Sequence, residues 1–88
     1  DYLSSRAKFY FDHKFLADSY YLLTLDNQAA RHYEKALESI DVFSRIDQFE
    51  IYKNLGNIYV RLADYDGAEE FYNKAHCLFP LSDLLQVN

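Results

Sequence analysis

The most informative stretch of the chain is residues 49–82, which read FEIYKNLGNIYVRLADYDGAEEFYNKAHCLFPLS. Its first half carries apolar residues at three- and four-residue steps, as in Tyr52, Leu55 and Tyr59, and this spacing is typical of one face of an α-helix. A second such stripe follows, formed by Ala68, Tyr72 and Ala75. Pro80 ends it, because proline lacks the backbone N–H that a helix needs. The stretch therefore predicts two helices joined by a short turn.

The same periodicity extends over the rest of the chain. It predicts four helices, at about residues 3–25, 28–43, 48–63 and 67–78. Asp26 and Asn27 could cap the second helix. Asp47 and Asp66 precede the third and fourth, and each is followed three residues later by a glutamate, Glu50 and Glu69, in a capping-box-like pattern. No segment alternates with period two for long enough to be a strand. The sequence therefore predicts an all-α fold of antiparallel helix pairs.

The two halves of the chain repeat each other at an offset of 39 residues. The matching positions are Leu16, Ala17, Tyr20, Ala29, Tyr33 and Ala36 in the first half and Leu55, Gly56, Tyr59, Ala68, Tyr72 and Ala75 in the second. Small residues such as Gly56 and Ala68 allow the two helices of a pair to approach closely, and the tyrosines fill the space beside them. This alternation predicts the same packing in both halves.

With this pattern, the chain resembles the tetratricopeptide repeat family, whose 34-residue motif is a helix–turn–helix. Residues 49–82 fit the motif throughout, with aromatic Tyr52 and Tyr72 replacing the usual Trp and Phe. Residues 10–43 are a degenerate copy, with His13 for an aromatic residue, Ala17 for glycine and Asp41 for the closing proline. The resemblance implies helix pairs stacked as a short right-handed solenoid.

The organisation expected for residues 1–88 is a single domain of this type or a part of a longer array, since the chain begins at Asp1 without Met. A leading helical segment at 1–9 precedes the degenerate repeat at 10–43. An extended connection at 44–48 leads to the well-matched repeat at 49–82, and 83–88 begin a following helix. Because 39 exceeds 34, either the second helix is longer by about a turn or the connection is looser.

Charge and hydropathy exclude several classes of partner. The net charge is −5 and the pI is near 4.9, so the chain repels the phosphates of nucleic acids and anionic membrane surfaces. The longest apolar run, Tyr20 to Leu23, is far short of the ~20 residues that cross a bilayer, and direct membrane insertion is not expected. We expect a cytoplasmic protein, with a periplasmic or other soluble compartment as the alternative.

The sequence offers little for catalysis. His13, His32 and His76 lie on different predicted helices without metal-ligand spacing, so we expect surface or half-buried histidines and no metal site. Cys77 is the only cysteine, and its apolar neighbours predict a small buried thiol. Neither a serine-nucleophile motif nor a glycine-rich phosphate loop is present. We expect no enzyme activity and no cofactor.

The resemblance implies that the first helix of each pair lines a concave groove for a protein or peptide partner. The corresponding positions are Phe11, Lys14, Phe15, Asp18, Tyr21 and Leu22, then Glu50, Lys53, Asn54, Asn57, Val60 and Arg61. The spacing of Lys53 and Asn57 is similar to part of the carboxylate clamp of co-chaperone repeats, whereas Asp18, at the corresponding step after Lys14, would repel a carboxylate. The alternative reading of these positions is a solvated helix face.

The sequence therefore favours a non-enzymatic protein–protein interaction module that acts as a scaffold. One alternative is a sensor or regulatory segment of a bacterial signalling protein. Another is a self-assembling structural or secretion-chaperone module that associates through the open ends of the solenoid, where an apolar tail follows. The residues of that tail are Leu81, Leu84, Leu85 and Val87.

Overall fold

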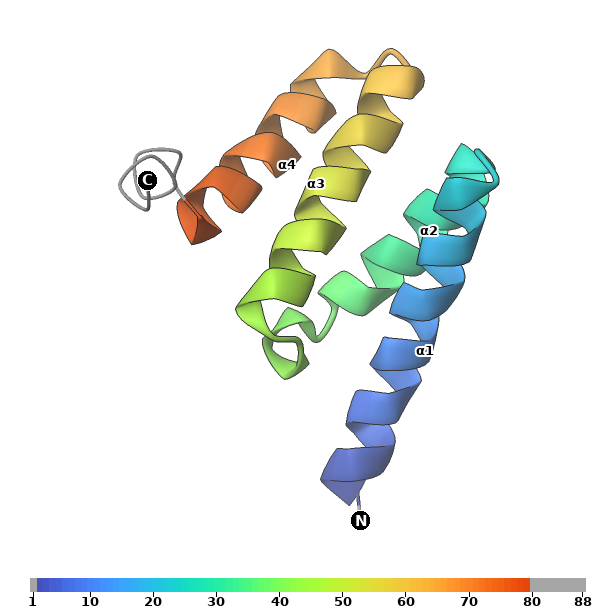
Figure 1. The fold of residues 1–88 in the computed structure, drawn as a ribbon, viewed down its shortest axis with the longest axis vertical. Coiled ribbons are helices and arrows are strands. Elements are labelled where there is room, and N and C mark those ends of the chain that lie inside the picture. The colour runs from blue at the N-terminus through green and yellow to red at the C-terminus, as the bar shows by residue number, and fades with distance from the viewer. Residues whose placement is uncertain (1, 80–88) are drawn as a thin grey trace, which may run out of the picture. The chain divides into compact units, whose positions relative to one another are not determined.

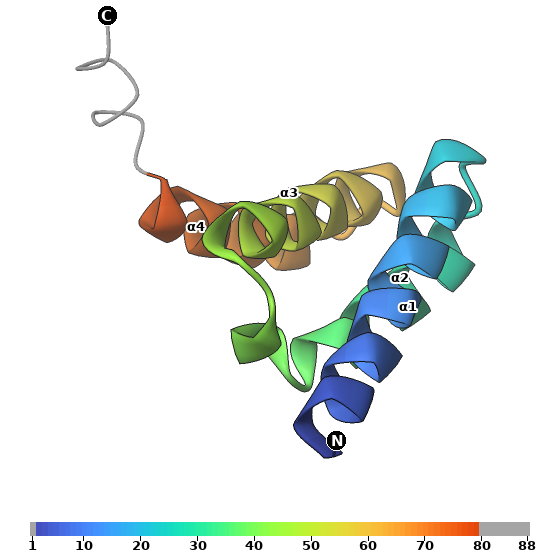
Figure 2. The same ribbon diagram turned by 60° about the horizontal axis from the view of Figure 1, so that its bottom comes forward.

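The computed structural model describes residues 2–79, with side chains from Ser5 onward. Its helices are α1 (Tyr2–Leu22), α2 (Asp26–Leu37), α3 (Arg45–Arg61) and α4 (Tyr65–Leu78), with a 3₁₀ turn at Ile40–Val42. No strand occurs within residues 2–79. Figure 1 and Figure 2 show α1 beside α2 and α3 beside α4. The predicted all-α fold of antiparallel helix pairs is confirmed.

The chain divides into two compact units, residues 1–44 and 45–88. In unit 1 the helices α1 and α2 pack on each other, and in unit 2 the helices α3 and α4 do so. Each unit is thus a helical hairpin. None of the helices in residues 2–79 combines the length and the apolarity that a membrane-spanning segment needs.

The turns of the two hairpins have the same backbone conformation at positions 39 residues apart. Thr24 has a φ of 59° and Ala63 a φ of 62°, which is the left-handed region. The amide of Leu25 donates to the carbonyl of Tyr20 over 2.9 Å, and the amide of Asp64 donates to the carbonyl of Tyr59 over 2.8 Å. Such six-to-one bonds satisfy the last carbonyls of a helix and end it sharply. The offset read from the sequence therefore holds for the backbone.

The interior of each hairpin holds the small residues of the repeat pattern. Ala17, Ala29 and Ala36 are buried in unit 1, as are Gly56, Ala68 and Ala75 in unit 2. Gly56 lies directly under the ring of Tyr72, and a Cβ at this position would be 2.6 Å from Cε1 of that ring. The two helices of unit 2 therefore come as close as they do because position 56 has no side chain.

The segment between the two hairpins differs from the prediction. Helix α2 ends at Leu37 and not at Phe43, and α3 begins at Arg45, so most of the extended connection expected at 44–48 is helical. Ser39 leaves the helical conformation with a φ of −140°, and its hydroxyl accepts a hydrogen bond from Nη2 of Arg6 over 2.5 Å. Phe43 is buried against the ring of Phe11, with centroids 5.2 Å apart. These contacts hold the segment after α2 on α1.

The helix starts also differ from the prediction. Helix α2 is preceded by Leu25, which makes no capping bond, and Asp26 is its first residue. Asp47 lies inside the first turn of α3, where its charge favours the helix dipole, and is not a cap. The cap of α4 is Asp64 and not Asp66, because its carboxylate accepts the amide N–H of Gly67 over 3.1 Å. Pro80 and the helix start expected at 83–88 lie outside the described residues.

Candidate protein-binding surface

Lys14 and Asp18, two of the predicted groove residues, belong to a polar network inside unit 1. The side chain of Lys14, a residue only 7% exposed, forms an ion pair with Asp18 over 3.1 Å. The hydroxyl of the buried Tyr33 donates a hydrogen bond to the same carboxylate. A buried ammonium group requires such a partner, since an unpaired charge away from water is costly. Asp18 therefore joins α1 to α2.

Unit 2 contains the corresponding bond 39 residues further on. The hydroxyl of Tyr72 donates to the side-chain oxygen of Asn57, as Tyr33 does to Asp18. Lys53 corresponds to Lys14 in the repeat, but it is exposed. The neutral amide of Asn57 could not balance the charge of a buried lysine there. The replacement of a carboxylate by an amide thus accompanies a change of the lysine from buried to exposed.

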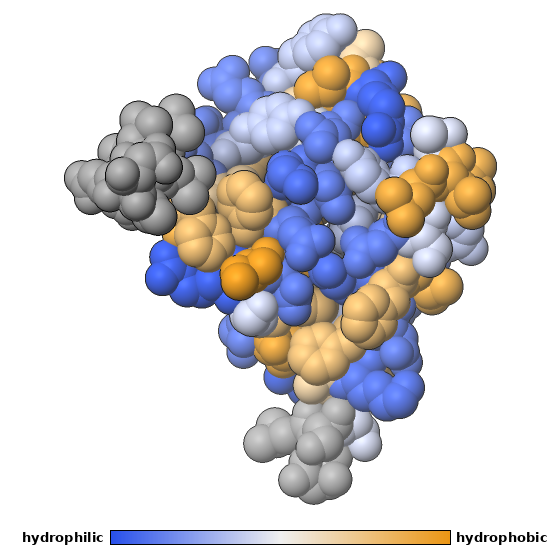
Figure 3. Space-filling model, in the orientation of Figure 1, coloured by the Kyte–Doolittle hydropathy of each residue, from blue (hydrophilic) through white to orange (hydrophobic). Residues whose placement is uncertain are grey.

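The apolar groove positions of α1 that lie on the surface are Phe15 and Leu22, which are 63% and 80% exposed. They are seven residues apart and share one face of the helix. A second exposed stripe consists of Phe9 and Leu16 on α1 and of Leu23, directly after its end. Leu16 thus differs from Leu55, its buried counterpart in the repeat pattern. On the face that Figure 3 draws, apolar side chains form several patches among hydrophilic ones.

The predicted groove residues therefore divide into two groups. One group takes part in the packing of its own hairpin or is buried there: Phe11, Lys14, Asp18, Asn54 and Asn57. The other group is exposed on the first helix of its unit: Phe15 and Leu22 on α1, and Lys53, Val60 and Arg61 on α3. Tyr21 and Glu50 are half-buried.

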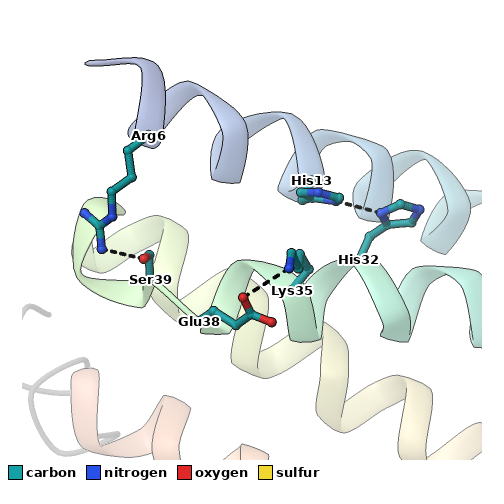
Figure 4. Close-up of polar contacts among 6 residues, drawn as sticks. All are labelled: Arg6, His13, His32, Lys35, Glu38 and Ser39. Atoms are coloured by element: carbon teal, nitrogen blue, oxygen red, sulfur yellow. Dashed lines mark hydrogen bonds and ion pairs between the residues drawn. The ribbon is translucent and has the colours of Figure 1, made fainter. Parts of the chain in front are cut away.

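A pair of histidines in unit 1 is a feature that the sequence reading missed. Figure 4 shows the Nδ1 atoms of His13 and His32 facing each other, and they lie 2.9 Å apart. The ring of His32 also stacks on Tyr20, with centroids 5.4 Å apart, and the ring of His13 meets the edge of Phe9 at 4.8 Å. Burial, and then the charges of His13 and Arg31, lower the pKa of His32 below its usual value.

Unit 2 has an aromatic cluster at the equivalent positions. Phe71 corresponds to His32 and stacks on Tyr59 at 5.4 Å and on Tyr52 at 6.3 Å. Tyr52 corresponds to His13, and its burial raises its pKa. The missed signal was therefore present in the repeat alignment, which places both histidines opposite aromatic residues. No group of three or more histidine, cysteine or acidic side chains suited to a metal occurs among the residues described.

Cys77 is exposed, which corrects the buried thiol expected from its apolar neighbours. Ala75, two residues earlier on α4, is buried. Two residues correspond to about 200° around a helix, so Cys77 lies on the opposite side from the face that packs on α3. The position on the helix thus determines the exposure of the thiol, and the hydropathy of adjacent residues does not.

The comparison with protein families agrees with this geometry. Residues 49–80 match the tetratricopeptide repeat. Comparison with curated proteins and with solved structures gave no match. Repeats of this family generally mediate protein–protein interactions and are typically non-enzymatic. The match begins within α3 and includes α4, which form a close-packed hairpin with Gly56 at its contact, so residues 49–80 of this chain are a tetratricopeptide repeat.

Proposed function

We propose that the chain is a non-enzymatic protein-binding scaffold in which α1 and α3 present the binding surfaces of their units. Residues 49–80 in its second unit match the tetratricopeptide repeat, and repeats of that family generally bind proteins. Unit 1 acts as a second, degenerate repeat. The identical turns at Thr24 and Ala63 support this, as do the equivalent tyrosine bonds to Asp18 and Asn57.

The observation that carries the proposal is the exposure of Phe15 and Leu22 on α1. Leaving two large apolar side chains in water forgoes about 1.5–3 kcal/mol each, relative to their burial. A partner that covers them recovers this free energy. On α3, the exposed Lys53 and Val60 are seven residues apart on one face of the helix, and the exposed Arg61 follows Val60. The surface of unit 2 therefore suits a segment with an apolar side chain and nearby carboxylate or carbonyl acceptors.

A peptide selection on the 88-residue chain tests this function. Peptides selected from a random library would be measured by fluorescence anisotropy against the wild type and two variants, Phe15→Ala and Lys53→Glu. A residue at the centre of a binding surface costs ~1–2 kcal/mol or more when truncated, so we expect Kd to rise about tenfold. Tyr65→Ala is the control, because Tyr65 is an equally exposed aromatic residue, at 66%, on α4.

The proposal predicts that peptides binding α1 lose affinity in Phe15→Ala, that peptides binding α3 lose it in Lys53→Glu, and that both kinds tolerate Tyr65→Ala. If the library yields no binder, or if the selected peptides respond to Tyr65→Ala and to neither of the other variants, the first helices are not the binding surfaces.

A further inference from the structure

The two units differ in the chemistry of equivalent ring clusters. In unit 2 the cluster consists of Tyr52, Phe71 and Tyr59, and in unit 1 the same positions hold His13, His32 and Tyr20. The stacking of the second ring on the third is similar in both, with centroids 5.4 Å apart and planes at 4° in unit 2 and 12° in unit 1. Unit 1 therefore contains two rings that accept protons where unit 2 contains a phenyl and a phenol.

The contact between the two imidazoles depends on their protonation. Two Nδ1 atoms 2.9 Å apart form a hydrogen bond only when one of them carries a proton and the other offers a lone pair. A neutral pair and a singly protonated pair both meet this condition. A doubly protonated pair does not, because two N–H groups and two positive charges then face each other. The contact therefore cannot survive protonation of both rings.

The surroundings of the pair add positive charge. Arg31, next to His32 on α2, is one cause of its lowered pKa. Lys35 lies 5.7 Å from the centroid of Phe9, whose ring contacts His13. The neighbouring acids on α1, Asp12 and Asp18, form ion pairs with lysines of the same helix. The acids of α2 are Asp26 and Glu34, and Glu38, directly after the helix, pairs with Lys35 at 3.2 Å.

We propose that the pair of His13 and His32 makes unit 1 a proton-sensitive switch, packed in neutral solution and loosened in mildly acidic solution, while unit 2 stays packed. The switch acts on the contact between α1, which carries the exposed Phe15 and Leu22, and α2, which packs on it. It does not depend on what the chain binds. Acid would therefore change unit 1 whether or not a partner is present.

The direction of the effect follows from proton linkage. An unfolded histidine takes up its proton near pH 6.5, whereas the fold holds the pKa of His32 below that value. The unfolded state thus binds more protons than the folded state below about pH 6.5, and the free energy of unfolding falls as the pH falls. The loss begins near pH 6.5 and is complete once the pH is below the lowered pKa of the folded state.

Native-state amide exchange of the 88-residue chain at pH 7.5 and pH 5.5, in the presence of a chelator, tests the switch. After correction for the intrinsic effect of pH on exchange, we expect the opening of α1 and α2 to increase at least about fivefold, the change that corresponds to the loss of one hydrogen bond. We expect α3 and α4 to change less than about twofold, since the equivalent ring cluster of unit 2, Tyr52, Phe71 and Tyr59, contains no imidazole.

The residues of unit 2 at the equivalent positions define a matched variant of unit 1. The double substitution His13→Tyr with His32→Phe gives unit 1 the rings of unit 2 and should abolish the acid response of α1 and α2. His76→Asn removes the exposed histidine of α4 and should leave the response intact. Equal acid responses of the double variant and the wild type would overturn the proposal, as would equal responses of the two units in the wild type.

A second measurement does not require the double variant to fold. The Cε1 protons of His13 and His32 can be followed by NMR through a pH titration of the wild type. Two groups that share one hydrogen bond titrate in separate, coupled steps. We expect His13→Asn to change the titration of His32. A His32 curve that is the same in this variant and in the wild type would show that the contact does not couple the rings and would overturn the switch.

Discussion

A Cβ atom on Gly56 would lie 2.6 Å from Cε1 and 2.7 Å from Cδ1 of Tyr72. Carbon atoms in normal contact are about 3.5–4.0 Å apart, so the ring and any side chain at position 56 exclude each other. The hydroxyl of Tyr72 is also held, because it donates a hydrogen bond to Asn57, the residue after Gly56 on α3. Two neighbouring residues of α3 therefore position one ring of α4.

Substitution of Gly56 should destabilise unit 2 through this contact. We expect Gly56→Ala to cost ~1 kcal/mol, because Tyr72 is partly exposed and its ring can move at the expense of its hydrogen bond. Gly56→Leu should cost ~2–3 kcal/mol, since the larger side chain also separates α3 from α4. Urea denaturation followed by circular dichroism measures both changes.

A double-mutant cycle shows whether the ring is the cause. If the clash with Tyr72 produces the loss, Gly56→Ala should cost much less in a Tyr72→Leu background than in the wild type. Equal costs in both backgrounds would place the cause elsewhere in the helix, and the close approach would not be what requires glycine at this position.

The two equivalent tyrosine hydroxyls should differ in their contribution to stability. Tyr33 is buried and donates to the carboxylate of Asp18, which also holds Lys14. Its removal by Tyr33→Phe should cost ~1.5–3 kcal/mol, as expected for a hydrogen bond to a charged group. Tyr72→Phe removes a more exposed bond to a neutral amide and should cost ~0.5 kcal/mol. Equal losses in urea denaturation would contradict the role assigned to Asp18.

The repeat could be predicted from the sequence because the close approach of two helices requires small residues at fixed positions. Gly56 and Ala68 occupy positions where two helices approach, and such positions recur with the period of the fold. The start of α3 was missed because Ser44 and Asp47 have the same capping spacing as Asp47 and Glu50, and the prediction used the later pair. The end of α2 was missed because tertiary contacts of Ser39 and Phe43 draw the chain away from it.

The candidate protein-binding surface was harder to predict from the sequence than the repeat. Lys14 and Lys53 occupy the same repeat position, yet one is buried and the other exposed, and the difference accompanies the change from Asp18 to Asn57 one turn later. A family pattern assigns both lysines to a groove, but it does not report what each side chain contacts. The histidine pair was missed for a related reason, because residues 19 positions apart in sequence meet only through the register of the hairpin.

The cap of α4 gives a test between two acids that are two residues apart, Asp64 and Asp66. Asp64 accepts the amide N–H of Gly67, which would otherwise have no partner within the helix. Asp64→Ala should therefore destabilise unit 2 by ~1 kcal/mol. Asp66 lies in the first turn of α4, and its replacement by alanine should cost only a few tenths of a kcal/mol through the helix dipole. A larger loss for Asp66→Ala than for Asp64→Ala would return the cap to the residue that the sequence pattern favoured.

The turn of unit 2 offers a stabilising substitution. Ala63 has a φ of 62°, and a side chain with a Cβ in this region costs ~1–2 kcal/mol relative to the right-handed conformation. Glycine adopts it without that cost but loses more entropy on folding, so Ala63→Gly should stabilise unit 2 by ~0.5–1 kcal/mol. Ala75→Gly is the matched control, since Ala75 is buried in the middle of the helix contact, and it should destabilise by ~1 kcal/mol or more. If both substitutions lower the urea midpoint, the left-handed turn is not under strain.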